Sequence, residues 1–362
     1  MTTTLGSDAL LTLEGITAQL QDLYSDWLLL RGSTATIQQQ PDFSLSLLPT
    51  LPEDQAVVRQ HVSDYQTDES GELLSVFQSF ITMGEQFQNF GAALLPLART
   101  LDGGQSGEPA YVAARSQFDA ALAQLQTVCA SEDPDHPSSV YNQVAAVKAA
   151  FDAFYDEKVE DDVVRFQTAL KEAKYSGNID KLKADLTSLQ SQIDEVNGEI
   201  AQGATSEIPE ALEFGMSLGE AATAELPVGM IVVNVAVQVS SEAQSASKFS
   251  QEWEARYQKL DQLTSRYVSE LEELESDEQQ MAVLQTLADQ VGSLGATVTD
   301  VRGKLAAATA SFASLRLGFE ELGDMDAPTD STYFEDQVSQ GVQFWAGVAQ
   351  ACTRYLANAR SM

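Results

Sequence analysis

The chain has 362 residues, of which 54 are acidic and 20 basic, so its formal net charge at pH 7 is −34. That charge repels nucleic-acid phosphates and anionic membranes, so nucleic acid is excluded as an expected partner. Two histidines, His61 and His136, and two cysteines, Cys129 and Cys352, are too few and too scattered for a usual zinc site or a disulfide framework. We expect two reduced thiols in helices, although one tertiary bridge stays open.

Sequence motifs for nucleotide, phosphate or zinc chemistry are missing, since no GxGxxG, GxxxxGK[ST] or HExxH occurs. The sequence therefore predicts no enzyme, no catalytic residue, no cofactor and no metal. The first fifteen residues, MTTTLGSDALLTLEG, have no basic region and no continuous apolar run, so they do not predict a secretory signal. We expect a protein that stays in the cytoplasm or leaves by another route.

The first predicted helix begins near Ser7 or Asp8, either of which would cap it. Its apolar residues alternate spacings of three and four, as one face of a helix requires: Leu13, Ile16, Leu20, Leu23, Trp27 and Leu30. Residues 31–52 contain three prolines and predict an irregular connection.

A second long helix is predicted over 53–99, with a buried side formed by Leu73, Phe77, Phe80, Phe87, Phe90 and Leu94. The glycine-rich stretch 101–109 breaks it. A third helix follows, with its apolar face at Tyr111, Ala114, Phe118, Ala121, Leu125 and Val128. Residues 131–137, SEDPDHP, end that helix.

Two long helical arms are predicted next. Residues 138–208 contain no proline, and their second half has a heptad pattern at Ile179, Leu182, Leu186, Leu189, Ile193, Val196 and Ile200. The second arm reaches Gly323 and Pro328, and it carries the same alternation from Trp253 to Leu322. Each arm would be about 100 Å long if unbroken, at roughly 1.5 Å per residue.

The last predicted helix begins at Thr332, which forms a capping box with Glu335. Its aromatic residues, Phe334, Phe344, Trp345 and Tyr355, are expected in the core. Because every arm is amphipathic, the fold class is all-α: an elongated antiparallel bundle with a very long helix hairpin. We expect a helical tail bundle of 1–205 plus 241–362, and a small head of 206–240 between the two arms.

The head has a different pattern from the rest of the chain. Residues 228–239 read VGMIVVNVAVQV, with an alternation typical of a β-strand and too few residues for a membrane-spanning helix. The preceding segment mixes apolar residues with five glutamates, so it predicts either short helices or one arm of a β-hairpin that turns at 226–229. The head would either cap the end of the bundle or expose an apolar interaction site.

A helical bundle of this length, with a long antiparallel helix pair and an apolar tip of β character, resembles the cytolysin A type α-helical pore-forming toxins. This group includes multi-component enterotoxins. The resemblance covers nearly the whole chain and is one of architecture and segment order. It implies a soluble form whose β-tongue or helical head refolds on a target-cell membrane, after which subunits assemble into a ring.

The residues of this head that the resemblance would place against membrane lipid or a partner are apolar: Val228, Met230, Ile231, Val232, Val233, Val235, Val237, Val239, Leu226, Phe214, Met216 and Leu218. Glu213, Glu220 and Glu225 depart from a wholly apolar head, since an ionised Glu at the bilayer centre costs about 2 to 4 kcal/mol. They are candidate lumen-facing or pH-sensitive residues. The chain therefore resembles one component of a multi-subunit system that forms homo- or hetero-oligomers with related toxin subunits.

An alternative stays open, because heptads and acidic faces are also typical of a coiled-coil adaptor or scaffold protein. Its valine-rich tip would then dock on a protein partner. A pore component is expected to be released without a conventional signal peptide, to be soluble first and to associate with membranes afterwards.

Overall fold

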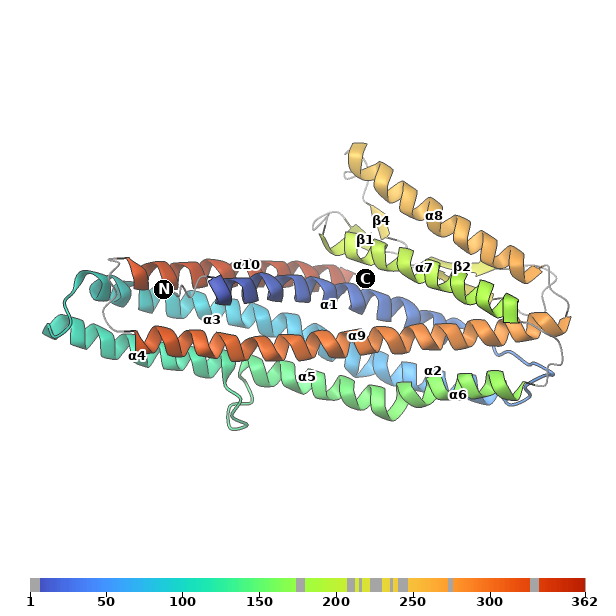
Figure 1. The fold of residues 1–362 in the computed structure, drawn as a ribbon, viewed down its shortest axis with the longest axis horizontal. Helices are drawn as coiled ribbons and strands as arrows, with labels where there is room; N and C mark the ends of the chain where they lie inside the picture. Colours follow the sequence, from blue (N-terminus) through green and yellow to red (C-terminus); the bar gives the residue numbers. More distant parts are fainter. Residues whose placement is uncertain are drawn as a thin grey trace. The chain divides into compact units, whose positions relative to one another are not determined.

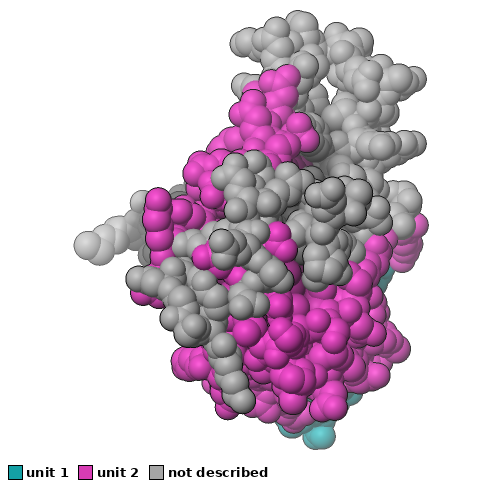
Figure 2. Space-filling model, turned by 90° about the vertical axis from the view of Figure 1, so that its right-hand side faces the viewer, with its two compact units in different colours: residues 1–20, 72–149, 303–357 teal, residues 21–71, 150–302, 358–362 magenta. Residues whose placement is uncertain are grey.

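The computed structural model describes residues 7–173, 180–206, 212–214, 217–221, 230–234, 237–239, 247–272, 276–325 and 332–361. The chain divides into two compact units, coloured separately in Figure 2. Unit 1 comprises 1–20, 72–149 and 303–357, and unit 2 comprises 21–71, 150–302 and 358–362.

Helices make up most of the described residues (Figure 1). They are α1 (Ser7–Gln39), α2 (Leu51–Thr67), α3 (Glu69–Gly103), α4 (Pro109–Ala130), α5 (Val140–Phe154), the π-helix η1 (Tyr155–Val159), α6 (Glu160–Glu172), α7 (Asp180–Ser206), α8 (Ser247–Glu272), α9 (Ser276–Asp324) and α10 (Tyr333–Ser361). Four short strands, β1 (Leu212–Phe214), β2 (Ser217–Ala221), β3 (Met230–Asn234) and β4 (Val237–Val239), lie between α7 and α8 in the sequence. The predicted all-α fold class is confirmed.

The core of unit 1 is a stack of aromatic rings between α3, α9 and α10. Trp345 stacks on both Phe80 and Phe87, with ring centroids 6.2 and 5.3 Å apart. Phe312 and Phe319 of α9 stack in turn on Phe80 and Phe87. The predicted apolar faces of α3 and α10 therefore pack against each other, although Phe90 and Phe344, which were also expected to be buried, are only partly buried.

The core of unit 2 follows the heptad pattern of α7. Leu186, Leu189, Ile193, Val196 and Ile200 are all buried, as predicted. Helix α8 packs against α7 and runs in the opposite direction (Figure 1), and Lys259 of α8 lies 3.9 Å from the carboxylate of Glu199. The antiparallel pairing of the two arms is thus present in unit 2, with the strand segment between them in sequence.

The strands form two antiparallel ladders, β1 with β4 and β2 with β3. Leu212 pairs with Val239 in the first ladder, and Ala221 pairs with Met230 in the second. In each pair, the sum of the two residue numbers is the same in both ladders. The two ladders therefore have the register of a single hairpin. The predicted turn at 226–229 lies outside the described residues.

The prediction of an irregular connection over 31–52 is wrong for its first part, because α1 continues to Gln39. Only Pro41 and the residues after it prevent helix formation, since proline restricts the residue before it and not those several positions earlier. The Thr36 hydroxyl donates to the Gly32 carbonyl oxygen at 2.9 Å, which satisfies that polar group without interrupting the helix.

Two predicted long helices are interrupted. The one over 53–99 is divided at Asp68 into α2 and α3, although Pro96 lies inside α3 without ending it. The arm over 138–208 contains η1 and then ends at Glu172, because Ala173 has an extended ψ of 121°. An unbroken 100 Å arm is therefore wrong for this segment.

The capping box at the start of α10 is also wrong. The backbone N–H groups of Phe334 and Glu335 donate to the carboxylate of Asp102 at 3.0 and 2.9 Å. A residue of α3 thus supplies the cap, while the Thr332 hydroxyl donates to Asp336.

Candidate functional site

The predicted head residues divide into those within strands and those outside the described residues. Phe214, Leu218, Met230, Ile231, Val232, Val233, Val237, Val239, Glu213 and Glu220 lie in β1 to β4. Val228, Val235, Leu226, Met216 and Glu225 lie outside the described residues. The role of this set in binding stays a prediction.

The register of the ladders brings apolar residues opposite one another. Phe214 pairs with Val237 and Leu218 with Val233. Of the two described glutamates, Glu213 pairs with Gln238 and Glu220 with Ile231. The valine-rich half of the head therefore has a mainly apolar partner strand, as cross-strand pairing favours.

The stretch 215–219, GMSLG, fits the G-x-S-x-G pattern of serine hydrolases. In those enzymes the serine stands on a sharp turn from a strand to a helix. Ser217 instead begins β2 and pairs with Asn234 of β3. The surrounding structure that this motif requires is absent at Ser217, so the pattern carries no catalytic proposal.

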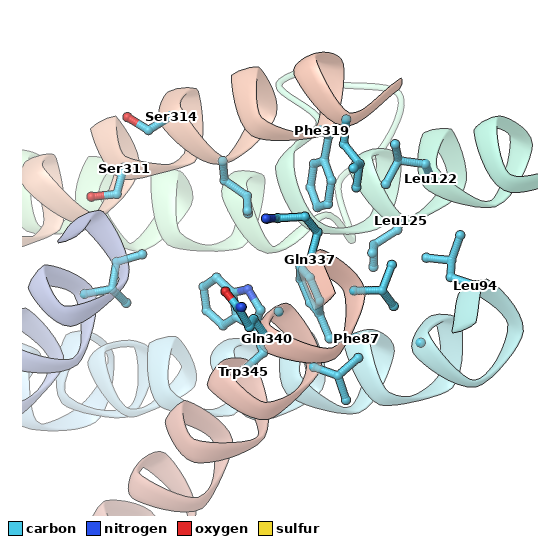
Figure 3. A pocket seen from close by; sticks show the side chains of 17 residues that line it. Phe87, Leu94, Leu122, Leu125, Ser311, Ser314, Phe319, Gln337, Gln340 and Trp345 are labelled. Carbon is cyan, nitrogen blue, oxygen red and sulfur yellow. The ribbon is translucent and has the colours of Figure 1, made fainter. Parts of the chain in front are cut away.

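An apolar pocket of about 90 Å³ lies inside unit 1. Figure 3 shows Phe87 and Leu94 of α3, Leu122 and Leu125 of α4, Phe319 of α9 and Trp345 of α10 around it. Its polar lining consists of two serines and two glutamines, Ser311, Ser314, Gln337 and Gln340, with no titratable side chain. The pocket is thus a gap in the aromatic core without groups for acid–base chemistry.

The two cysteines are free and buried, which confirms the prediction of reduced thiols in helices. Burial raises the pKa of the Cys352 thiol to about 12 and raises the pKa of the Cys129 thiol as well. Since the thiolate is the reactive species, both cysteines are inert packing residues near neutral pH.

A buried acid joins α2 and α6 in unit 2. Asp162 is buried, and its carboxylate lies 2.8 Å from the Nδ1 atom of His61. Burial raises the pKa of Asp162, while the hydrogen bond to His61 opposes that shift. A second pair, Lys158 of η1 with Asp64 of α2 at 2.9 Å, joins α2 to the π-helix that directly precedes α6. These contacts fix α6 against α2.

Within the described ranges, no group of three or more histidine, cysteine or acidic side chains is placed to hold a metal ion. Among the helices that the structure describes, none has a stretch long and apolar enough to cross a membrane.

The arrangement of long helices is shared with solved structures. The chain is similar to soluble SmhA of the tripartite α-pore-forming toxin Smh from Serratia marcescens, with a TM-score of 0.68, 14% identity, and coverage of 96% of this chain and 95% of that one. For soluble AhlB of the tripartite toxin AHL from Aeromonas hydrophila, the TM-score is 0.71 at 12% identity, with coverage of 94% and 92%. The Bacillus cereus HblL1 toxin component gives 0.68 at 14% identity, with coverage of 94% and 96%.

The family follows from the sequence itself. Residues 11–202, slightly more than half of the chain, match the model of the Bacillus haemolytic enterotoxin (HBL) family. The chain belongs to this family, and the resemblance to α-helical pore-forming toxins is confirmed. No curated protein sequence matches the chain.

Proposed function

We propose that this chain is a component of a multi-subunit α-pore-forming cytotoxin. The main support for this proposal is that the chain belongs to the haemolytic enterotoxin family. The fold that it shares with components of tripartite toxins supports the proposal as well. Its subunit partners would be related toxin components, and its target would be membrane lipid. The protein would be released in a soluble form without a conventional signal peptide and would join a homo- or hetero-oligomer on the membrane.

The head would make the contact with membrane or partner. Support comes from the position of β1 to β4 between the paired helices α7 and α8 and from the pairing of apolar residues across the ladders. A refolded 208–239 segment is long enough to span about 30 Å of hydrocarbon as one helix. Its glutamates would then face a water-filled lumen or another subunit, because lipid-exposed carboxylates are costly.

Vesicle leakage tests this proposal. The chain is added to dye-loaded liposomes alone and together with related components encoded by neighbouring genes, and bound protein is measured by flotation. We expect leakage only with the related components. The double substitution Val233→Asp and Val237→Asp should reduce binding by about tenfold or more, because each buried charge at the bilayer centre costs roughly 2.5 to 3.5 kcal/mol.

The double substitution Val164→Asp and Leu317→Asp is the matched control, since these residues are 53% and 57% exposed and the change adds the same two negative charges. It should leave flotation unchanged. Equal loss in both variants would show general charge repulsion and contradict a head-specific role. Capture of one defined protein, with no binding to liposomes in any combination, would favour the adaptor alternative.

The head glutamates also suggest a pH dependence. Protonation of Glu213, Glu220 and Glu225 would lower the cost of moving the head into lipid, so membrane association should strengthen as pH falls. Flotation that is equal between about pH 5 and 8 would contradict this part of the proposal.

A further inference from the structure

The apolar pocket of about 90 Å³ in unit 1 has a buried floor and an accessible mouth (Figure 3). The floor consists of side chains that are at most 7% exposed: Ile16, Phe87, Leu94, Leu122, Leu125, Phe319, Leu322, Val338 and Trp345. The mouth consists of half-buried or exposed residues of α9 and α10: Ser311, Ser314, Leu315, Gln337, Gln340, Gly341 and Val342. Phe87, Phe319 and Val338 keep 6%, 7% and 7% of their surface accessible, so a small molecule can reach the floor.

Gly341 leaves the space above Phe87 open. A Cβ atom on Gly341 would lie 3.8 and 4.0 Å from two ring atoms of Phe87, which is ordinary van der Waals contact. A side chain at this position would therefore occupy part of the pocket without displacing the backbone. The opening beside Phe87 exists because residue 341 has no side chain.

The floor disfavours water. The indole Nε1 atom of Trp345 is the single polar side-chain atom among the described floor residues, and it donates no hydrogen bond to another described residue. A bound water molecule needs two to four polar partners, and cavities with apolar walls stay dry and accept apolar molecules instead. The favourable occupant of the floor is therefore apolar.

The mouth is polar but carries no charge, since none of the described residues that line it is acidic or basic. The amides of Gln337 and Gln340 make no hydrogen bond to another described residue. An ionised group here would lose water without meeting an opposite charge, and the net charge of −34 opposes an anion further. A hydroxyl or amide group, in contrast, can exchange hydrogen bonds with both glutamines.

From this arrangement we infer that the pocket binds an uncharged single-chain amphiphile. The end of its aliphatic chain would lie on Phe87 and Phe319, and its hydroxyl or amide head would lie at Gln337 and Gln340. The volume limits the ligand, because a dry cavity of about 150 Å³ holds benzene. A pocket of about 90 Å³ therefore accepts the end of an unbranched chain, with the rest of the chain in the mouth.

The test is saturation-transfer NMR of the full chain with three ligands of equal chain length: hexan-1-ol, hexanoate and hexylammonium. Titrations are run at neutral pH and constant ionic strength, which keeps the screening of the large net charge equal. We expect hexan-1-ol to bind and both ions to bind about tenfold or more weakly. The terminal methyl group of hexan-1-ol should receive more saturation than the CH₂ group next to the hydroxyl, because it lies deeper.

A substitution that fills the pocket makes the test specific. Gly341→Ala places a methyl group against Phe87 and should weaken binding of hexan-1-ol about threefold or more. Gly347→Ala is the matched control, since it is the same change on the same helix, its Cβ would meet nothing within 4 Å, and Gly347 does not line the pocket. It should leave binding unchanged.

A substitution that charges the mouth tests the position of the head group. Gln340→Lys, at an exposed position, supplies a cation and should improve binding of hexanoate about tenfold. Gln343→Lys is its control, because Gln343 is also exposed on α10 but does not line the pocket. It should leave the preference among the three ligands as it is in the parent chain.

Absence of saturation transfer to hexan-1-ol would overturn the inference. So would equal binding by Gly341→Ala and Gly347→Ala, since the ligand would then lie elsewhere, and so would equal binding of all three ligands, which indicates unspecific adsorption. These measurements use the chain without membranes or other toxin components, so the inference and the proposed function can fail separately.

Discussion

The close approach of α3 and α10 in unit 1 makes Gly84→Ala a sharp test of the aromatic core. A Cβ atom on Gly84 would lie 2.5 Å from the Cβ of Ala349 and 2.6 Å from the carbonyl oxygen of Trp345. Both distances are far below van der Waals contact, and a backbone oxygen cannot rotate away. The helices would have to separate, and Trp345 would lose its stacking on Phe80 and Phe87.

Two opposing effects set the change in the free energy of unfolding that Gly84→Ala causes. Overpacking a close contact costs about 1 to 3 kcal/mol, while replacing glycine by alanine inside a helix returns about 1 kcal/mol. One of the two clashes is with a backbone oxygen, so the overpacking cost should lie in the upper part of its range, and a net loss of about 1 to 2 kcal/mol is expected for Gly84→Ala. Gly347 of α10 has nothing within 4 Å of a built Cβ, so Gly347→Ala should gain about 0.5 to 1 kcal/mol instead.

Gly91→Ala completes the series. Its Cβ would meet a methyl group of Val342, which is the end of a side chain and can rotate, so its cost should lie between the other two. Urea unfolding followed by circular dichroism and by tryptophan fluorescence measures all three variants. If Gly84→Ala is as stable as the parent chain, or if Gly347→Ala loses as much, the packing of α3 on α10 described above is wrong.

Three further predictions concern polar contacts. Asp102→Ala removes the cap of α10 and should cost about 1 to 2 kcal/mol in urea unfolding, whereas Asp102→Asn should cost less. His61→Ala leaves the buried Asp162 carboxylate without its partner and should lower the melting temperature more at pH 7 than Asp162→Asn does. Burial raises the pKa of Asp194 and of Asp289, so their effect on stability has a definite sign. The folded chain favours the protonated form of both acids, so their contribution to the free energy of unfolding is full below the ordinary Asp pKa of about 3.9. That contribution is lost as the pH rises through their raised pKa values in the folded chain. In Asp194→Asn, the free energy of unfolding should therefore depend less on pH.

Much of the helical pattern could be predicted, because a buried face repeats every three or four residues whatever it packs against. The heptads of α7 and the aromatic face of α10 are examples. The strand character of 230–234 could be predicted for the same reason, since its alternation has a period of two. Helix ends were harder: α1 continues through Gly32 to Gln39, since a single glycine weakens a helix by only about 1 kcal/mol.

Contacts between distant residues could not be predicted. The cap of α10 comes from Asp102, more than 200 residues away, while the local pattern favoured Thr332 and Glu335. One side of a polar pocket between α1, α7 and α9 in unit 2 can be recognised in the sequence, because the polar residues Gln190, Asp194 and Asn197 follow one another at spacings of four and three along one helix. Such a stripe inside an apolar heptad predicts a buried polar contact, but only the fold shows that α1 and α9 supply its other side.

The acidic groups of the head and of the polar pocket in unit 2 should respond to low pH in opposite directions. Protonated head glutamates would favour membrane association, whereas protonation of the buried Asp194 would favour the folded state of unit 2. A substitution at each place separates the two effects. Asp194→Asn imitates the protonated pocket at every pH, so its flotation with liposomes should still increase as pH falls.

The combined substitution of Glu213, Glu220 and Glu225 by Gln should give flotation that no longer changes with pH, while the pH dependence of unfolding contributed by Asp194 remains. If Asp194→Asn alone removes the acid dependence of flotation, the titrating group lies in unit 2 and the head glutamates have no part in it. If both variants retain it, the general repulsion among 54 acidic residues is the remaining cause, since protonation lowers that repulsion throughout the chain.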